Sequence, residues 1–135
     1  MIFLDTNILL YSVSTAADEG TKREQAIALV NRDDCGLSVQ VLQEFYAQAT
    51  RASRPDPLPH DIAAGLIRTW LRFVVQENTV AVLQGALEIK ASHRFSFWDS
   101  AIIAAARALG CRELYSEDFS HGQEVEGIRI VNPFR

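Results

Sequence analysis

Hydrophobic positions along the chain fall into short continuous runs that alternate with stretches of helical spacing. The runs are rich in β-branched and aromatic residues and are bounded by polar ones, which is typical of short buried strands. They predict strands at residues 2–4, 37–38, 74–75, 113–116 and 128–131. Apolar residues spaced three or four positions apart predict helices at residues 6–13, 21–31, 39–52, 62–73, 79–93 and 97–109.

Local signals mark several of these boundaries. Thr21 with Glu24 predicts a capping box at the start of the second helix, and Ser96 with Asp99 predicts one for the last helix. Gly110 is expected to end that last helix. Residues 54–59 hold three of the four prolines and are expected to form a loop.

Short strands that alternate with helices predict an α/β fold. We expect a three-layer α/β/α arrangement with a mostly parallel sheet of about five short strands. The 48% hydrophobic and 22% charged content is that of a globular protein, and 135 residues are enough for one domain with a core. Because the proline loop is short, a single domain over residues 1–135 is expected.

Charge and cysteine content narrow the classes of function. The net charge of −4 excludes attraction to nucleic acid by overall charge, so RNA or DNA binding would need local arginines or a bound cation. Cys35 and Cys111 form no metal-binding or redox motif and are expected to be buried free thiols. There is no signal-peptide pattern and no apolar run of the ~20 residues that a membrane span needs. A cytoplasmic protein is therefore expected.

Two carboxylates stand at the ends of predicted strands. Asp5 is the first residue after the strand at residues 2–4, and Asp118 follows Tyr115 by three positions. Ligands of open α/β sheets bind beyond the carboxyl ends of the strands, at the crevice where the strand order reverses. If these two strands are neighbours, both side chains enter one crevice.

Two further acids lie on predicted helices. Glu44 occupies the polar stripe of its helix, and the pattern alone favours a solvated surface residue for it by roughly two to one. Asp99 fits a capping role at a helix N-terminus. The helix that follows it is apolar nearly all round, however, so Asp99 is expected to be partly desolvated and to need a partner.

A convergence of these acids would demand a cation. Two carboxylates about 5 Å apart repel by roughly 3 kcal/mol at an effective dielectric near 20, so a cluster of four must bind protons or metal. An all-oxygen site suits Mg²⁺ or Mn²⁺, which activate water and neutralise the charge that develops on a phosphodiester during in-line attack.

The assembled motifs resemble those of the PIN-domain family, and within it the VapC-type ribonuclease toxins of type II toxin–antitoxin systems. The resemblance covers essentially the whole chain, and the order and spacing of its pieces make it specific. It is carried by Phe3-Leu4-Asp5-Thr6-Asn7-Ile8, the segment from Ser38 to Glu44, Phe97-Trp98-Asp99-Ser100-Ala101-Ile102-Ile103-Ala104-Ala105-Ala106, Leu114-Tyr115-Ser116-Glu117-Asp118-Phe119 and Ile130-Val131-Asn132-Pro133-Phe134.

The resemblance implies that this is a metal-dependent endoribonuclease that cleaves single-stranded RNA, forms a homodimer and is neutralised by a small antitoxin protein. It also implies a set of site residues. The metal ligands would be Asp5, Glu44 and Asp99, with Asp118 assisting, and the residues that hydrogen-bond these acids or a phosphate would be Thr6, Asn7 and Ser116. Simple helix capping is the alternative role for Thr6 and Asn7. Glu117, beside Asp118, leaves the fourth acid ambiguous.

Other residues are open to two interpretations. Arg51 lies two turns beyond Glu44 on the predicted helix, which makes it the first candidate for a phosphate contact. Trp70 and Trp98 are expected to be core aromatics. The helical face with Ile62, Leu66 and Trp70 suits either the core or a partner surface.

Two classes of protein other than a nuclease also have acidic residues at the ends of strands. One is a binding module that keeps the fold without catalysis. A receiver-like phosphotransfer domain fits poorly, because the only lysines, Lys22 and Lys90, do not follow a late strand.

Overall fold

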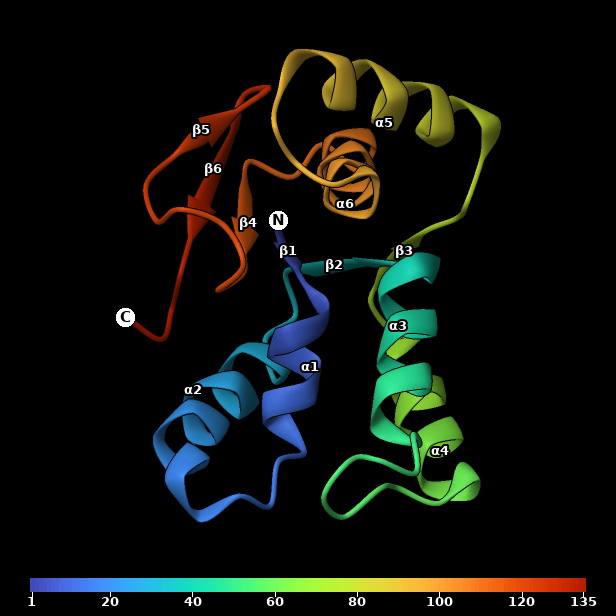
Figure 1. Ribbon diagram of the computed structural model, residues 1–135, viewed down its shortest axis with the longest axis vertical. Coiled ribbons are helices and arrows are strands. Elements are labelled where there is room, and N and C mark those ends of the chain that lie inside the picture. The colour runs from blue at the N-terminus through green and yellow to red at the C-terminus, as the bar shows by residue number, and fades with distance from the viewer.

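A computed structural model describes all 135 residues and has an α/β architecture (Figure 1). The elements follow in chain order as β1 (Ile2–Leu4), α1 (Thr6–Ser12), the 3₁₀ helix η1 (Ala17–Glu19), α2 (Gly20–Val30), β2 (Cys35–Ser38), α3 (Val39–Ala49), α4 (His60–Trp70), β3 (Val74–Gln76), α5 (Val80–Ser92), α6 (Phe97–Ala108), β4 (Glu113–Tyr115), β5 (Glu124–Val125) and β6 (Ile128–Val131). In Figure 1 the strands lie between helices α5 and α6 on one side and helices α1 to α4 on the other. The expected three-layer α/β/α arrangement is therefore confirmed.

The sheet has the strand order β3-β2-β1-β4-β6-β5. Neighbouring strands are parallel throughout, except that β5 runs antiparallel to β6. From β1 the chain builds outward through β2 and β3, and it then returns to place β4 on the other side of β1. The order therefore reverses between β1 and β4, and it is at such a reversal that open α/β sheets form a crevice for ligands.

The core forms where α6 covers the sheet. Helix α6 contacts β2, β3, β4 and β6, and α5 packs against it as well. Covered on several sides, it buries seven consecutive residues from Ser100 to Ala106. Strand β1, at the centre of the sheet, is buried along its whole length, as its uninterrupted apolar sequence predicts. Asp5 thus directly follows a fully buried strand, and Asp99 lies in the first turn of a helix whose next seven residues are buried.

The sheet has six strands where about five were expected. The missing strand, β5, is only two residues long and pairs with β6 through a tight turn at Glu126 and Gly127, both of which have positive φ. A two-residue strand shows no alternation of hydrophobic and polar positions, so the sequence pattern could not reveal it.

The capping box expected at Thr21 and Glu24 is wrong. Helix α2 begins at Gly20, directly after η1, and no side chain caps its first turn. Because η1 leads straight into α2, Thr21 lies inside the helix rather than before it. The cap expected at Ser96 is present, since its hydroxyl accepts a hydrogen bond from the Asp99 amide. Helix α3 ends at Ala49, three residues earlier than the sequence predicts.

Three smaller expectations have clear outcomes. Cys35 and Cys111 are buried free thiols, as expected. Trp70 belongs to the core, but Trp98 is 62% exposed, so the expectation of a core role is wrong for Trp98. None of the helices combines the length and apolar character that crossing a membrane requires.

Candidate active site

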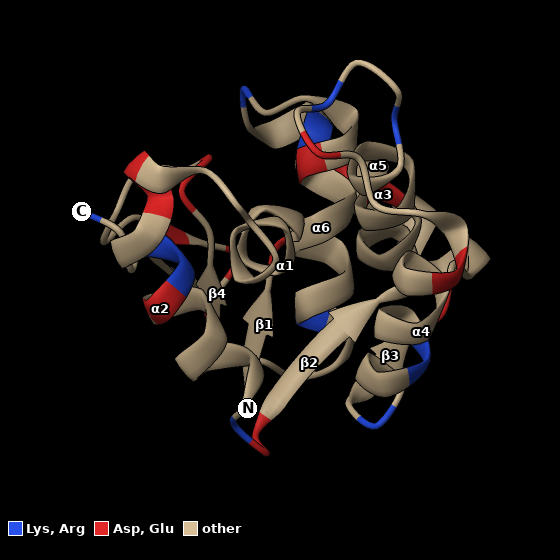
Figure 2. Ribbon diagram, turned by 90° about the horizontal axis from the view of Figure 1, so that it is seen from below, with Lys and Arg blue, Asp and Glu red and all other residues tan.

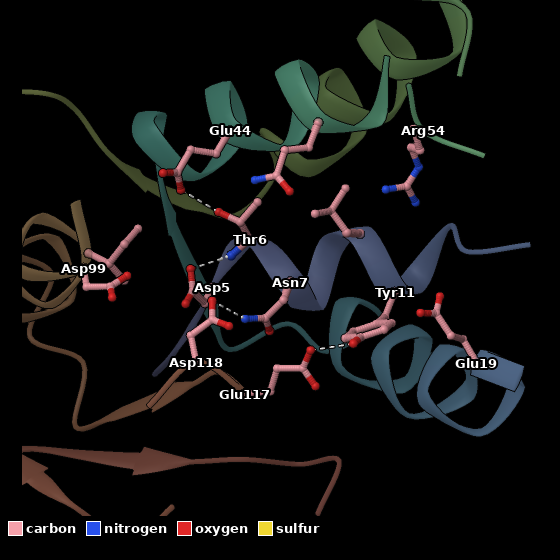
Figure 3. Close-up of a pocket in the computed structure, with 13 residues that line it drawn as sticks. Asp5, Thr6, Asn7, Tyr11, Glu19, Glu44, Arg54, Asp99, Glu117 and Asp118 are labelled. Carbon is pink, nitrogen blue, oxygen red and sulfur yellow. Dashed lines mark hydrogen bonds between the residues drawn. The ribbon is translucent and has the colours of Figure 1, made fainter. Parts of the chain in front are cut away.

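A polar cavity of about 360 Å³ opens at the carboxyl ends of β1 and β4, at the point where the strand order reverses (Figure 3). Only three of its 13 lining residues are hydrophobic. The acidic residues that line it are Asp5, Glu19, Glu44, Asp99, Glu117 and Asp118. All four carboxylates expected to form the site thus lie around one cavity, although they come from four separate segments of the chain.

Asp5 is the most buried of these acids, with only 3% of its surface exposed. Its position follows from the end of β1, where the backbone turns into α1 and the Asp5 side chain caps the new helix by accepting from the Thr6 amide at 2.7 Å. The Ser116 hydroxyl donates to the other carboxylate oxygen, also at 2.7 Å. The pKa of Asp5 is nevertheless raised to about 7, mainly by burial, which outweighs these two hydrogen bonds, and to a smaller extent by the charges of Asp118 and Glu44.

The end of β4 is tied to the start of α1 by Ser116 and Asn7. Besides donating to Asp5, the fully buried Ser116 hydroxyl accepts from the Asp118 amide at 3.0 Å and from the Asn7 side chain at 3.3 Å. The Asn7 amide group also donates to Asp118 at 3.0 Å. These bonds fix the Asp118 carboxylate beside Asp5, which is possible because β1 and β4 are neighbours.

Glu44 reaches the cavity from α3. Ser38, at the end of β2, caps α3 by accepting from the Val41 amide, and this sets the direction of the helix. The Thr6 hydroxyl donates to Glu44 at 2.8 Å, and the Gln40 side chain donates to it at 3.4 Å. Glu44 is half-buried, so the surface position that the pattern alone favoured is wrong.

Asp99 completes the group from the first turn of α6. It is half-buried, and its pKa is raised, first by burial and then by the charge of Asp118. The partial desolvation expected from the apolar helix behind it is therefore present. Asp5 and Asp99 both hold their protons more tightly than an ordinary carboxyl group, which is the signature of negative charges that lack a counter-ion.

Glu117 already has hydrogen-bond and ion-pair partners on the side of the cavity away from Asp99. Tyr11 donates its hydroxyl hydrogen to one Glu117 oxygen (Figure 3), and Lys22 forms an ion pair with the other at 3.1 Å. The Lys22 ammonium also lies 4.8 Å from the centre of the Tyr11 ring. The Glu117 carboxylate is thus already paired with the Lys22 ammonium, whereas the Asp118 carboxylate accepts only from the Asn7 side-chain amide.

The arginine expected to contact substrate is not at the cavity. Arg51 is exposed and lines no part of it, and Arg54 lines it instead. The change follows from the early end of α3, because Arg51 and Arg54 lie in the loop beyond the helix. Elsewhere the lysines and arginines are scattered over separate elements (Figure 2).

Helical spacing could have revealed two of the lining residues that sequence reasoning missed. Tyr11 lies one turn after Asn7, and Gln48 lies one turn after Glu44. Residues four positions apart lie on the same face of a helix, so a cavity that is lined by Asn7 and Glu44 is expected to be lined by Tyr11 and Gln48 as well. Glu19, in the short 3₁₀ helix η1, gave no such signal.

The residues that line the cavity suit a divalent cation that keeps part of its hydration shell. No group of three acidic, histidine or cysteine side chains is close enough together to hold one ion on its own. Mg²⁺, however, keeps several of its waters and binds proteins through one or two carboxylates, so a spread of carboxylates around a polar cavity suits it. The lining holds six carboxylates and no histidine or cysteine, so the donor set is of the all-oxygen kind that Mg²⁺ and Mn²⁺ prefer. The residues present fit Mg²⁺ or Mn²⁺.

The fold and the cavity together define an α/β protein with an acidic ligand site at the reversal of its sheet. The PIN-domain family model matches residues 2–122, and the chain belongs to this family. No curated protein sequence matches the chain significantly.

Several solved structures share the fold. VapC20 of Mycobacterium tuberculosis, described as a sarcin–ricin loop cleaving toxin, is 22% identical, with a TM-score of 0.66 over 87% of this chain and 92% of its own. The toxin–antitoxin complex from Klebsiella pneumoniae has a TM-score of 0.71 at 15% identity, covering 99% and 98% of the two chains. FitAcB from Neisseria gonorrhoeae has a TM-score of 0.68 at 16% identity over 99% of each chain. At these identities the likeness shows a common fold.

Proposed function

We propose that this protein is an Mg²⁺- or Mn²⁺-dependent endoribonuclease that cleaves single-stranded RNA. The observation that carries the proposal is the gathering of Asp5, Glu44, Asp99 and Asp118 around one cavity at the reversal point of the sheet. Membership of the PIN-domain family, whose members are typically nucleases, supports it. RNA as the substrate class rests on the likeness to VapC20.

One or two of the four carboxylates would hold the cation directly and the others through its waters, and when bound the ion supplies a Lewis acid and an activated water. The surrounding residues set the geometry of the acids. Ser116 and the Thr6 amide hold Asp5, and Asn7 holds Asp118. The Thr6 hydroxyl orients Glu44. Because Asp5, Glu44 and Asp118 each accept from a donor in another segment, a cation would meet carboxylates that lose little conformational freedom when it binds.

The direct test is cleavage of a single-stranded RNA by the purified protein. Millimolar Mg²⁺ or Mn²⁺ should give cleavage products, EDTA should stop the reaction, and an Asp99→Asn variant should be slower by at least about 100-fold. Binding of RNA without cleavage under all metal conditions would favour a PIN-fold binding module instead.

We further propose that the protein is a toxin with a small antitoxin partner and that it forms a homodimer. The Klebsiella and Rickettsia relatives, which were solved as toxin–antitoxin and VapBC complexes, support the partner. Exposed apolar side chains offer a surface for one or both contacts. They are Val80, Leu83 and Leu87 on α5 and Trp98 on α6. The face of α4 with Ile62, Leu66 and Trp70, which the sequence left open to either the core or a partner, is less suited to a partner because Trp70 is buried.

Glu117 and its neighbour Asp118 are expected to contribute unequally to the rate of cleavage, because Glu117 is already paired. Because Tyr11 and Lys22 already satisfy Glu117, the Glu117→Gln variant should keep its cleavage rate within about threefold. Asp118→Asn should lose at least about tenfold, since it removes a charge that faces Asp5 and Asp99. Initial rates and the Mn²⁺ concentration for half-maximal activity check this. Equal losses in the two variants would mean that Glu117 shares the role of Asp118.

A further inference from the structure

The acidic cavity holds a single cationic side chain, that of Arg54. In Figure 3 this side chain lies across the cavity from Asp99, and its guanidinium is directed inward. Arg54 is half-buried, yet its guanidinium forms no ion pair and no side-chain hydrogen bond. A guanidinium carries five donors and seldom stays partly buried without an acceptor.

The carboxylates nearest to Arg54 have other partners. A second hollow of about 250 Å³ shares Glu19 and Arg54 with the acidic cavity and is also lined by Asp56. Glu19 accepts a hydrogen bond from the Ser14 hydroxyl, and Asp56 accepts one from Thr15 at 2.7 Å. The Arg54 guanidinium forms an ion pair with neither of these two acids.

The two hollows adjoin, because Glu19 and Arg54 line both of them. Within the acidic cavity, the half-buried Gln48 side chain forms no hydrogen bond and follows Glu44 by one turn of α3, and Arg54 comes from the loop beyond that helix. Along α3 and this loop the lining therefore changes from the Glu44 carboxylate to the Gln48 amide and then to the Arg54 guanidinium. A strand with evenly spaced phosphates would find a bound cation at one end of this lining and a guanidinium at the other.

We infer that Arg54 binds a backbone phosphate of the substrate strand, next to the linkage held at the acids, and so positions the strand across the cavity. This inference rests on the proposed ribonuclease function. Arginine suits the task because its planar fork donates two parallel hydrogen bonds to a phosphate. The net acidic surface makes such a contact more valuable, because little else in the cavity attracts the strand.

The test pairs a protein variant with a single neutral linkage in the RNA. Strands that carry one methylphosphonate at successive positions around the cut are bound to the Asp5→Asn protein, which is expected not to cut them, and affinity is measured by fluorescence anisotropy. Neutralising the linkage that meets Arg54 should weaken binding by about 10- to 100-fold, the range for a charge-assisted contact. When Arg54→Gln is added to the Asp5→Asn protein, the unmodified strand should bind more weakly by the same factor. In this double variant, neutralising the linkage that meets Arg54 should cause no further loss of affinity.

Two further readouts separate positioning from a general effect. Arg54→Gln should lower the slope of log affinity against log salt by about 0.7, the value for one phosphate contact on a single strand. In the otherwise wild-type enzyme it should raise KM with little change in kcat, and Arg54→Lys should recover part of the loss. The matched control is Arg68→Gln on the exposed surface of α4, which removes the same charge away from the cavity and should change neither value.

The outcomes for Arg54 and for the nuclease proposal can be told apart. If the wild type cuts RNA and Arg54→Gln binds and cuts as the wild type does, the inference about Arg54 is overturned alone. The inference would also be overturned if the loss of affinity caused by Arg54→Gln and the loss caused by a neutral linkage multiplied independently at every linkage tested. No one phosphate would then be coupled to Arg54. If the wild type cuts no RNA but the coupling to one linkage is present, Arg54 binds phosphate and the nuclease proposal fails.

Discussion

An Asp5→Asn variant is expected to cleave RNA at least about 10³-fold more slowly than the wild type, a loss of roughly 4 kcal/mol of transition-state stabilisation. The substitution removes the charge at the centre of the cavity but keeps the size of the side chain. Asn can still accept from the Thr6 amide, as Asp5 does. The loss should therefore appear in kcat at saturating Mg²⁺, measured on a fluorogenic single-stranded RNA.

The variant should remain folded. Without metal, Asp5 is a carboxylate buried without a counter-ion, so its neutral replacement should unfold at the same temperature or higher. Asp33→Asn is the matched control, because it makes the same change at an exposed turn outside the cavity and should leave the rate unchanged. An Asp5→Asn protein that cuts as fast as this control would contradict the assignment of Asp5.

The metal-free protein is expected to lose stability as the pH rises from about 4 to about 7. The pKa of Asp5 is about 7 in the folded protein, whereas the ordinary value is 3.8. The folded state therefore holds this proton more tightly than the unfolded state, and the free energy of unfolding falls over that interval and is level above it. The full difference corresponds to about 4 kcal/mol at most, and the raised pKa of Asp99 acts in the same direction.

Urea unfolding in EDTA at pH 5 and at pH 8 measures this effect. Asp5→Asn removes the titrating group, so its stability should depend less on pH than that of the wild type. Mg²⁺ should restore stability to the wild type at pH 8, because the ion binds the deprotonated carboxylates of the folded state. A wild type and an Asp5→Asn variant with the same pH dependence would show that the buried carboxylate is not protonated as described.

The strand-end acids could be predicted from sequence because their placement depends on few steps. An apolar run that ends at Asp5 fixes both the strand and the side of the sheet on which the carboxylate emerges. Asp118 required only that β1 and β4 be neighbours, which the structure confirms. Asp99 followed in the same way from the apolar helix behind it.

Glu44 shows where pattern alone fails. A glutamate on the polar stripe of a helix looks the same in sequence whether that stripe faces water or a cavity. The difference is made by Thr6, which is 38 residues away along the chain and donates its hydroxyl hydrogen to Glu44. The resemblance to the PIN family, not the periodicity, pointed to the cavity.

The sequence ranked Arg51 ahead of Arg54 as a phosphate contact and placed Trp98 in the core, and these two errors have related causes. Both depend on where a helix ends or which of its faces stays uncovered, and boundaries are the least certain part of a sequence pattern. Helix α3 stops at Ala49, so the loop that follows brings Arg54 rather than Arg51 to the cavity. Trp98 follows Phe97 in an apolar helix but lies on the side of its first turn that nothing covers.

Calorimetric titration of the metal-free protein with Mn²⁺ at pH 6.5 tests the central claim, that the cavity around Asp5 is a divalent-cation site. We expect saturable binding that releases protons, because the ion displaces the proton held on Asp5 near its pKa of about 7. Proton release is measured by repeating the titration in buffers of different ionisation enthalpy, and it should disappear in Asp5→Asn. Mn²⁺ binding that is absent, or that is the same with and without the Asp5 carboxylate, would contradict the account.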